Sequence, residues 1–173
     1  MKIINPLEIP ERDLPLIVLT DDRRSLISWI IKARTKRNYG HVMELYRPDW
    51  YASQNFGGFK EVPIIKYIKP QIILKLWKPI LTDEQRKLWI SMVRADLRAP
   101  WINRRYDWLG VIGQALGIRG LQIEAMKYCS ERVNARLRLV YKTQFPYQQT
   151  PGEQNEMFKK DNRFELFGYA GIN

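Results

Sequence analysis

The sequence predicts an α+β fold in which a small antiparallel sheet packs against helices. Short apolar segments alternate in character and are separated by turn residues, as antiparallel strands are. Other segments have a helical period, and one of them opens with a capping pattern. The 173 residues, 45% of them hydrophobic, are enough to bury one core. We therefore expect one compact domain over residues 1–147 and a C-terminal extension, 148–173, that packs on the domain or on a partner.

The predicted strands begin with the aliphatic run 16–19, which Thr20 and two aspartates close. The segment "HVMELYR" alternates in character, so His41 and Glu44 are expected on opposite faces of its strand. Further strands are expected around "WYASQ", "FKEVPI" and "IILKLWK", with Gly57-Gly58 and Pro70 as turns between them.

Amphipathic helices are expected at "SLISWIIKARTKR", "LTDEQRKLWISMVRADL" and "CSERVNARLRLVYK". In the second, Thr82 and Gln85 form a capping-box pattern, and Pro100 ends the helix. In the third, apolar residues should face inwards and the arginines outwards. The segment "YDWLGVIGQALGI" is apolar enough to be buried. In the C-terminal extension, "QQTPGEQNE" is typical of a disorder-prone connector.

The formal net charge of +11 and the pI near 9.8 favour an anionic partner: nucleic acid, a phospholipid surface, cell-wall polymer or an acidic protein. No nucleic-acid-binding motif accompanies the charge, so a nucleic-acid partner is supported by nothing in the sequence except the charge. A single cysteine excludes an internal disulfide, and no Cys/His cluster has the spacing of a structural zinc site. We expect neither a metal nor another cofactor.

The start of the sequence lacks the pattern of a signal peptide, and no apolar run approaches the length of a bilayer-spanning helix. We therefore expect no transmembrane segment. The expected location is the cytoplasm, or a phage particle that carries the protein or delivers it to the cell envelope.

The chain has one cysteine, Cys129, and one histidine, His41. If the last helix begins near 128–130, Cys129 lies in its first turn, where free backbone N–H groups and the helix dipole lower a thiol pKa. His41, at the start of a strand, is the base that a thiol nucleophile needs. Composition alone favours packing roles for both residues, and it is their position that favours chemistry.

Four segments occur in the order "NYGHVMEL", "WYASQNFGGFKEVP", "RRYDWLGVIG" and "KYCSERV". This set resembles the circularly permuted branch of the NlpC-type papain-like cysteine hydrolases, which includes YiiX-like proteins and is related to lecithin retinol acyltransferase. The resemblance covers about residues 14–142. It implies a permuted papain-like fold, with Cys129 as the nucleophile and His41 as the general base.

The resemblance also implies a third, polar residue on the strand after that of the histidine. Ser53 aligns best with this position, while Gln54 is the better amide to orient an imidazole; both are also ordinary residues before a turn. Neither is a carboxylate. Glu44 and Glu61 are nearby carboxylates that offer an alternative, and alternation disfavours Glu44.

Residues around the cysteine offer further candidates. Tyr128 is a candidate for the oxyanion pocket, with aromatic packing as its alternative role. Tyr106 and Asp107 resemble a motif that borders the cleft, and Asp107 is also a possible helix cap. Glu131 suits the first turn of a helix, although its charge opposes a thiolate at Cys129.

The leading interpretation is a cysteine hydrolase of the amidase or peptidase type that acts through a thioacyl-enzyme, with peptidoglycan stem peptides as its substrate. A lipid or N-acyl hydrolase or acyltransferase of the same fold is the enzymatic alternative. A non-catalytic docking module, for example in a phage tail or virion, is the alternative from another class. Such a module would bind its assembly through the basic face and the C-terminal extension.

Overall fold

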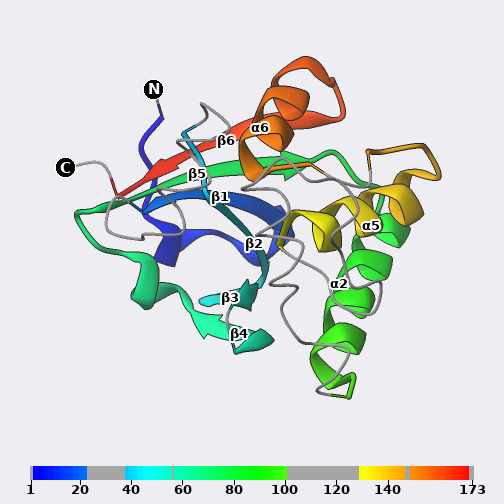
Figure 1. Ribbon diagram of the computed structural model, residues 1–173, viewed down its shortest axis with the longest axis horizontal. Coiled ribbons are helices and arrows are strands. Elements are labelled where there is room, and N and C mark those ends of the chain that lie inside the picture. The colour runs from blue at the N-terminus through cyan, green and yellow to red at the C-terminus, as the bar shows by residue number, and fades with distance from the viewer. Residues whose placement is uncertain (1, 23–37, 56, 101–128, 147–148, 172–173) are drawn as a thin grey trace, which may run out of the picture.

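The computed structural model describes residues 2–22, 38–55, 57–100, 129–146 and 149–171. In these residues it has an α+β fold, as predicted, with a six-stranded sheet and helices packed on it (Figure 1). The predicted helix over 25–37 and the apolar segment over 106–118 lie outside the described residues.

The sheet has the strand order β4-β3-β2-β1-β5-β6, and each neighbouring pair is antiparallel. This confirms the predicted antiparallel sheet. Strands β1 to β5 form at the five predicted segments, because each combines apolar or β-branched residues with flanking turn residues. Strand β6 lies in the C-terminal extension, where no strand was predicted. Their bounds are β1 (Leu16–Asp22), β2 (His41–Arg47), β3 (Trp50–Asn55), β4 (Gly58–Pro63), β5 (Ile72–Pro79) and β6 (Phe164–Ala170).

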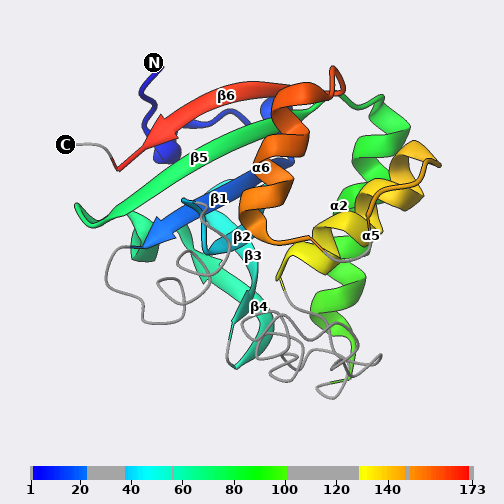
Figure 2. The same ribbon diagram turned by 45° about the horizontal axis from the view of Figure 1, so that its top comes forward.

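Three α-helices occur in the described residues: α2 (Asp83–Arg98), α5 (Cys129–Tyr141) and α6 (Pro151–Lys160). Thr82 and Gln85 form the predicted capping box, in which Thr82 N–H donates to Gln85 Oε1 over 2.9 Å. Helices α2 and α5 lie side by side at one end of the sheet, and α6 crosses the sheet beside them (Figure 2). Short 3-10 helices occupy Pro6–Glu8, Glu11–Asp13 and Ile64–Tyr67.

Each face of the sheet has its own apolar core. On the helix-covered face, Val42 and Leu19 of the sheet pack with Trp89, Leu137 and Phe158 of the helices. The opposite face buries a second group, which includes Leu16, Val18, Met43, Leu45, Tyr51, Ile64 and Leu74. Because both faces are covered, side chains from alternate positions of a strand enter different cores.

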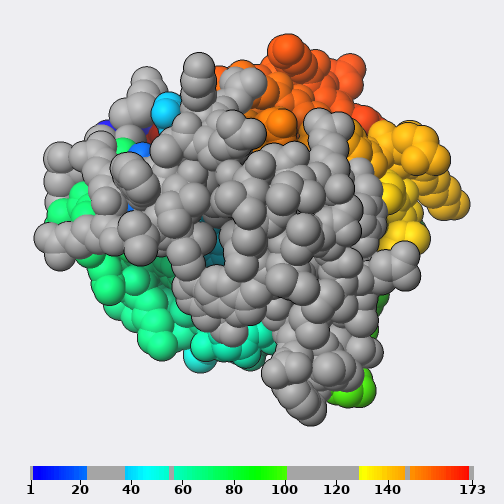
Figure 3. Space-filling view, viewed as in Figure 1, coloured from blue at the N-terminus to red at the C-terminus, as the bar shows by residue number. Residues whose placement is uncertain are grey.

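The C-terminal extension packs on the domain. Thr150 and Glu153 form a second capping box that starts α6, and β6 pairs with β5 at the edge of the sheet. Phe158 of α6 and Phe164 of β6 are buried with ring centroids 4.4 Å apart. The interpretation of "QQTPGEQNE" as a disorder-prone connector is wrong, because most of it is this capped helix. In the space-filling view, α6 and the chain leading into β6 form the upper edge of the molecule (Figure 3).

Among the described helices, none has both the length and the apolar character needed to cross a membrane. The described residues also contain no group of three or more His, Cys, Asp or Glu side chains placed to hold a metal ion.

Candidate active site

Cys129 is the first residue of α5, and α5 packs against β2 and β3. The side chain is buried, with 6% of its surface exposed. Backbone N–H groups of Val42, Ser130 and Cys129 itself interact with the sulfur. Val42 directly follows His41 in β2, so the thiol lies one peptide group away from the histidine. The pairing of β2 with β3 begins at Met43, the residue after Val42.

His41 begins β2 and is partly buried. Its Nε2 lies 2.9 Å from Oγ of Ser53 on the neighbouring strand β3, and the two atoms are hydrogen-bonded. When Nε2 carries the proton and donates it to this hydroxyl, Nδ1 is the basic ring nitrogen. Within the described residues, no hydrogen bond joins Sγ of Cys129 to the imidazole. The sulfur contacts the peptide group between His41 and Val42, and the imidazole is hydrogen-bonded to Ser53.

The two sides of the sheet explain this arrangement. Ser53 pairs in register with Met43, which places it on the same face as His41, away from the helices. Val42 and Cys129 belong to the core on the helix-covered face. The thiol therefore approaches from the helix side at the level of the Val42 amide, while the imidazole projects from the start of the same strand towards Ser53.

Burial controls the protonation of both groups. It raises the pKa of the Cys129 thiol to about 11, which outweighs the lowering by the three backbone N–H groups, and the Glu131 carboxylate raises it further. Burial also lowers the pKa of His41 to about 4. The expectation that the helix N-terminus gives a low thiol pKa is wrong, because desolvation outweighs the helix end. At pH 7 the pair consists of a neutral thiol and a neutral imidazole.

The structure separates the two candidates for the third residue. Ser53 contacts the imidazole. Gln54, the next residue of β3, lies on the helix-covered face, where its Oε1 accepts a hydrogen bond of 2.7 Å from Nε of Arg132. Both side chains are buried and hydrogen-bonded, and both lie within a strand that precedes the turn.

The two alternative carboxylates are bound elsewhere. Glu44 accepts hydrogen bonds of 2.8 Å from Nε1 of Trp89 and from Arg136. Burial raises the pKa of Glu44, and these two donors oppose that effect. Glu61 accepts hydrogen bonds from Arg47 and from the Tyr46 hydroxyl. The predicted placement of Glu44 on the face opposite His41 is consistent with these contacts.

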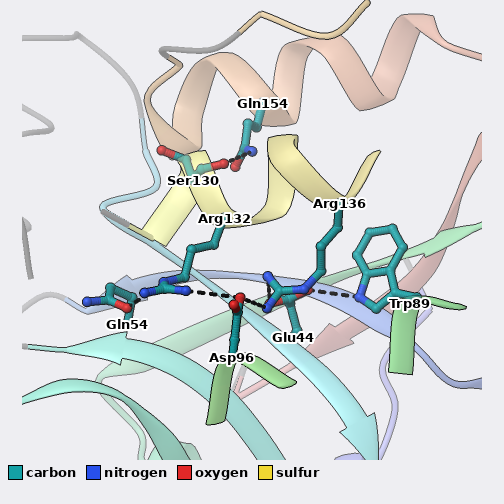
Figure 4. A network of polar contacts seen from close by, with 8 residues as sticks. All are labelled: Glu44, Gln54, Trp89, Asp96, Ser130, Arg132, Arg136 and Gln154. Carbon is teal, nitrogen blue, oxygen red and sulfur yellow. Dashed lines mark hydrogen bonds and ion pairs between the residues drawn. The ribbon is translucent and has the colours of Figure 1, made fainter. Parts of the chain in front are cut away.

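A network of polar side chains joins α5 to α2, β2 and β3 (Figure 4). Arg132 and Arg136 of α5 both bind Oδ2 of Asp96 in α2, at 2.9 and 2.6 Å. The expectation that the arginines of this helix face outwards is therefore wrong for these two, whose surfaces are 5% and 2% exposed. The sequence does contain a signal for them: a glutamate inside an otherwise apolar strand requires a cation when it is buried.

Helix α6 closes the network from the other side. Nε2 of Gln154 donates to the Ser130 carbonyl over 3.0 Å (Figure 4). The same nitrogen donates to Oδ1 of Asn134 over 2.7 Å. Ser130 in turn donates to the Gln149 carbonyl. The segment after Cys129 is thus fixed by side chains from the C-terminal extension, which the sequence interpretation did not include in the site.

Other candidates from the sequence have different outcomes. Glu131 is fully buried in the first turn of α5. Tyr128, Tyr106 and Asp107 lie outside the described residues.

Comparison of the sequence with models of known protein families gave no match, and comparison with curated proteins gave none either.

Proposed function

We propose that this chain is a cysteine hydrolase of the amidase or peptidase type, with a circularly permuted papain-like fold. The observation that carries the proposal is the position of the only cysteine and the only histidine of the chain. They are 88 residues apart in the sequence (129 − 41), yet Sγ of Cys129 interacts with the amide that follows His41. The hydrogen bond from His41 to Ser53 adds a third polar group in the place that the family resemblance implies.

The chemistry follows from these groups. Nδ1 of His41 takes the thiol proton as Sγ attacks the carbonyl carbon of the substrate. The backbone N–H groups that now interact with the sulfur are placed to stabilise the resulting oxyanion. The imidazolium then protonates the leaving amine, which departs and leaves a thioester on Cys129. His41 next activates a water molecule that hydrolyses this thioester, releasing the acid and restoring the thiol.

The neutral resting pair suits this sequence of steps. An imidazole with a pKa of about 4 stays unprotonated at neutral pH and can accept a proton. The thiol with a pKa of about 11 gives up its proton only as the sulfur forms its new bond. Proton transfer and attack are therefore concerted in this proposal, without a stable thiolate.

Peptidoglycan stem peptides are the proposed substrates. Two observations support them: the resemblance to the NlpC-type hydrolases, and the net charge of +11, which suits an anionic cell wall. Lipid esters and N-acyl amides are alternatives that use the same chemistry.

A second candidate function is that of a non-catalytic docking module. Three observations favour this alternative: the burial of the thiol, its raised pKa, and a hydroxyl in place of a carboxylate as the described side chain that is hydrogen-bonded to His41. A docking module would need the same fold but no catalysis by Cys129 and His41.

Alkylation of Cys129 by iodoacetamide distinguishes the two, with the wild type compared to His41→Ala and with Cys129→Ser as the control for labelling elsewhere. An enzyme should lose at least about tenfold in alkylation rate at pH 7 without His41. The His41-dependent part of the rate should persist to about pH 5 and disappear as the imidazole is protonated near pH 4. Equal rates in both proteins would contradict the catalytic proposal. Muropeptides and acyl esters then serve to identify the scissile bond.

A further inference from the structure

Arg132 joins the helix that carries the thiol to three other elements. It lies three residues after Cys129, one turn along α5. Its Nε donates to Oε1 of Gln54 in β3 over 2.7 Å, and one terminal nitrogen lies 2.9 Å from Oδ2 of Asp96 in α2. The guanidinium also lies over the ring of Phe59 in β4, 4.6 Å from its centroid.

The Arg132–Gln54 contact and the His41–Ser53 contact lie on opposite faces of the same part of β3. Ser53 and Gln54 are consecutive residues of β3, so their side chains leave opposite faces of the sheet. One face binds the imidazole through Ser53, and the other binds the cysteine helix through Gln54. A short stretch of backbone therefore connects the two halves of the candidate active site.

We propose that Arg132 is a positioning residue that fixes the first turn of α5 against β3, and so holds Cys129 against the peptide group that follows His41 while Ser53 holds the imidazole. The inference rests on the proposed function, since it concerns the geometry of the same reaction. Small displacements between a nucleophile and its base reduce rates strongly, which makes a rigid link at this point effective.

The guanidinium suits this role by its shape. It is planar, so it can bind Gln54 at one edge and Asp96 at another while its face covers Phe59. A lysine would offer a single charged point and could not make these three contacts together. Gln54, Asp96 and Phe59 belong to β3, α2 and β4, so these contacts of Arg132 link α5 to three other elements.

Arg136 provides a matched control in the same helix. It also binds Asp96, over 2.6 Å, and lies over Phe59, with 5.3 Å to the centroid. Its other partner is Glu44 instead of Gln54, and it lies seven residues, about two turns, from Cys129. Removal of either arginine disturbs the same ion-pair network, and only removal of Arg132 breaks the link to the strand of Ser53.

The experiment measures how strongly alkylation of Cys129 depends on His41 in different backgrounds. Iodoacetamide rates at pH 7 are compared with and without His41→Ala in the wild type, in Arg132→Met and in Arg136→Met. We expect a ratio of at least about tenfold in the wild type and Arg136→Met. In Arg132→Met the ratio should fall to within about threefold, because the pair is no longer aligned. If Arg132→Met only exposes the thiol more, both alkylation rates rise, and the ratio between the proteins with and without His41 stays low.

Two milder variants keep the test open should Arg132→Met fail to fold. Gln54→Met removes the acceptor at similar volume and should also abolish the dependence, whereas Gln54→Glu keeps an acceptor for Arg132 and should retain it. Full dependence in Arg132→Met or Gln54→Met would overturn the positioning role and leave the proposed function standing. A wild type without dependence on His41 would overturn the proposed function and this inference with it.

Discussion

Oγ of Ser53 lies 2.9 Å from Nε2 of His41, in a position where a carboxylate would stabilise an imidazolium far more strongly. When Nε2 carries the proton, the hydroxyl accepts its hydrogen bond and fixes the ring without adding charge. Burial lowers the His41 pKa to about 4.

Replacement of Ser53 by aspartate tests this account. We expect Ser53→Asp to raise the imidazole pKa by roughly 1 to 3, because a carboxylate next to the ring favours its charged form. The pKa can be followed by NMR titration of the Hε1 proton, without assignment ambiguity, since the chain has one histidine. Ser53→Asn is the neutral control and should leave the pKa low. The same pKa in both variants would mean that the side chain at 53 does not face the ring in solution.

The low His41 pKa also makes stability depend on pH. The imidazole has a pKa of about 4 in the folded protein and about 6.5 when exposed, so between these values only the unfolded chain binds the proton. The stabilising contribution is complete above about pH 6.5 and is lost as the pH falls towards 4. We expect the free energy of unfolding to fall by about 2 kcal/mol more in the wild type than in His41→Gln between pH 7 and 4.5. Urea denaturation at both pH values measures the difference, and parallel losses would rule out a buried neutral imidazole.

Removal of one partner of the buried pair Glu44 and Arg136 should destabilise the protein strongly. Glu44→Ala leaves the Trp89 N–H without its acceptor and leaves the buried Arg136 with Asp96 alone of its two carboxylate partners, and we expect a loss of about 3 to 5 kcal/mol in the free energy of unfolding. The double variant Glu44→Leu with Arg136→Met should lose less than the sum of the single variants, because no charge of this pair remains buried. Chemical denaturation of the wild type, both single variants and the double variant checks this. If the losses in the free energy of unfolding of the single variants simply add in the double variant, Glu44 and Arg136 do not interact.

Strands β1 to β5 and helix α2 were predictable because their signals are local. Alternation over 41–47, turn residues between strands and the Thr82–Gln85 capping box all act within a few residues. A second local signal was present at α6, where Thr150 and Glu153 have capping-box spacing, but the polar composition of this segment obscured it.

The site was predictable only in part. Alternation correctly separates His41 from Glu44, yet neither the inward turn of Arg132 and Arg136 nor the thiol pKa follows from sequence neighbours. Glu44 and Arg136 are 92 residues apart, and the pairing depends on how α5 packs on β2. The thiol pKa likewise depends on the burial that packing creates around the helix end.

The last prediction concerns the C-terminal extension as part of the domain. Gly171 follows β6 with φ of +76°, and a Cβ atom there would lie 2.0 Å from the Ile72 carbonyl oxygen of β5. Gly171→Ala should therefore destabilise the protein by about 1 to 3 kcal/mol, since the backbone must move to relieve the clash. Gly57→Ala is the control, because among the described residues a Cβ there meets the flexible end of the Lys60 side chain and no backbone atom. If thermal unfolding of Gly171→Ala matched that of the control, β6 would contribute little to the fold, and the extension would be free to serve a partner instead.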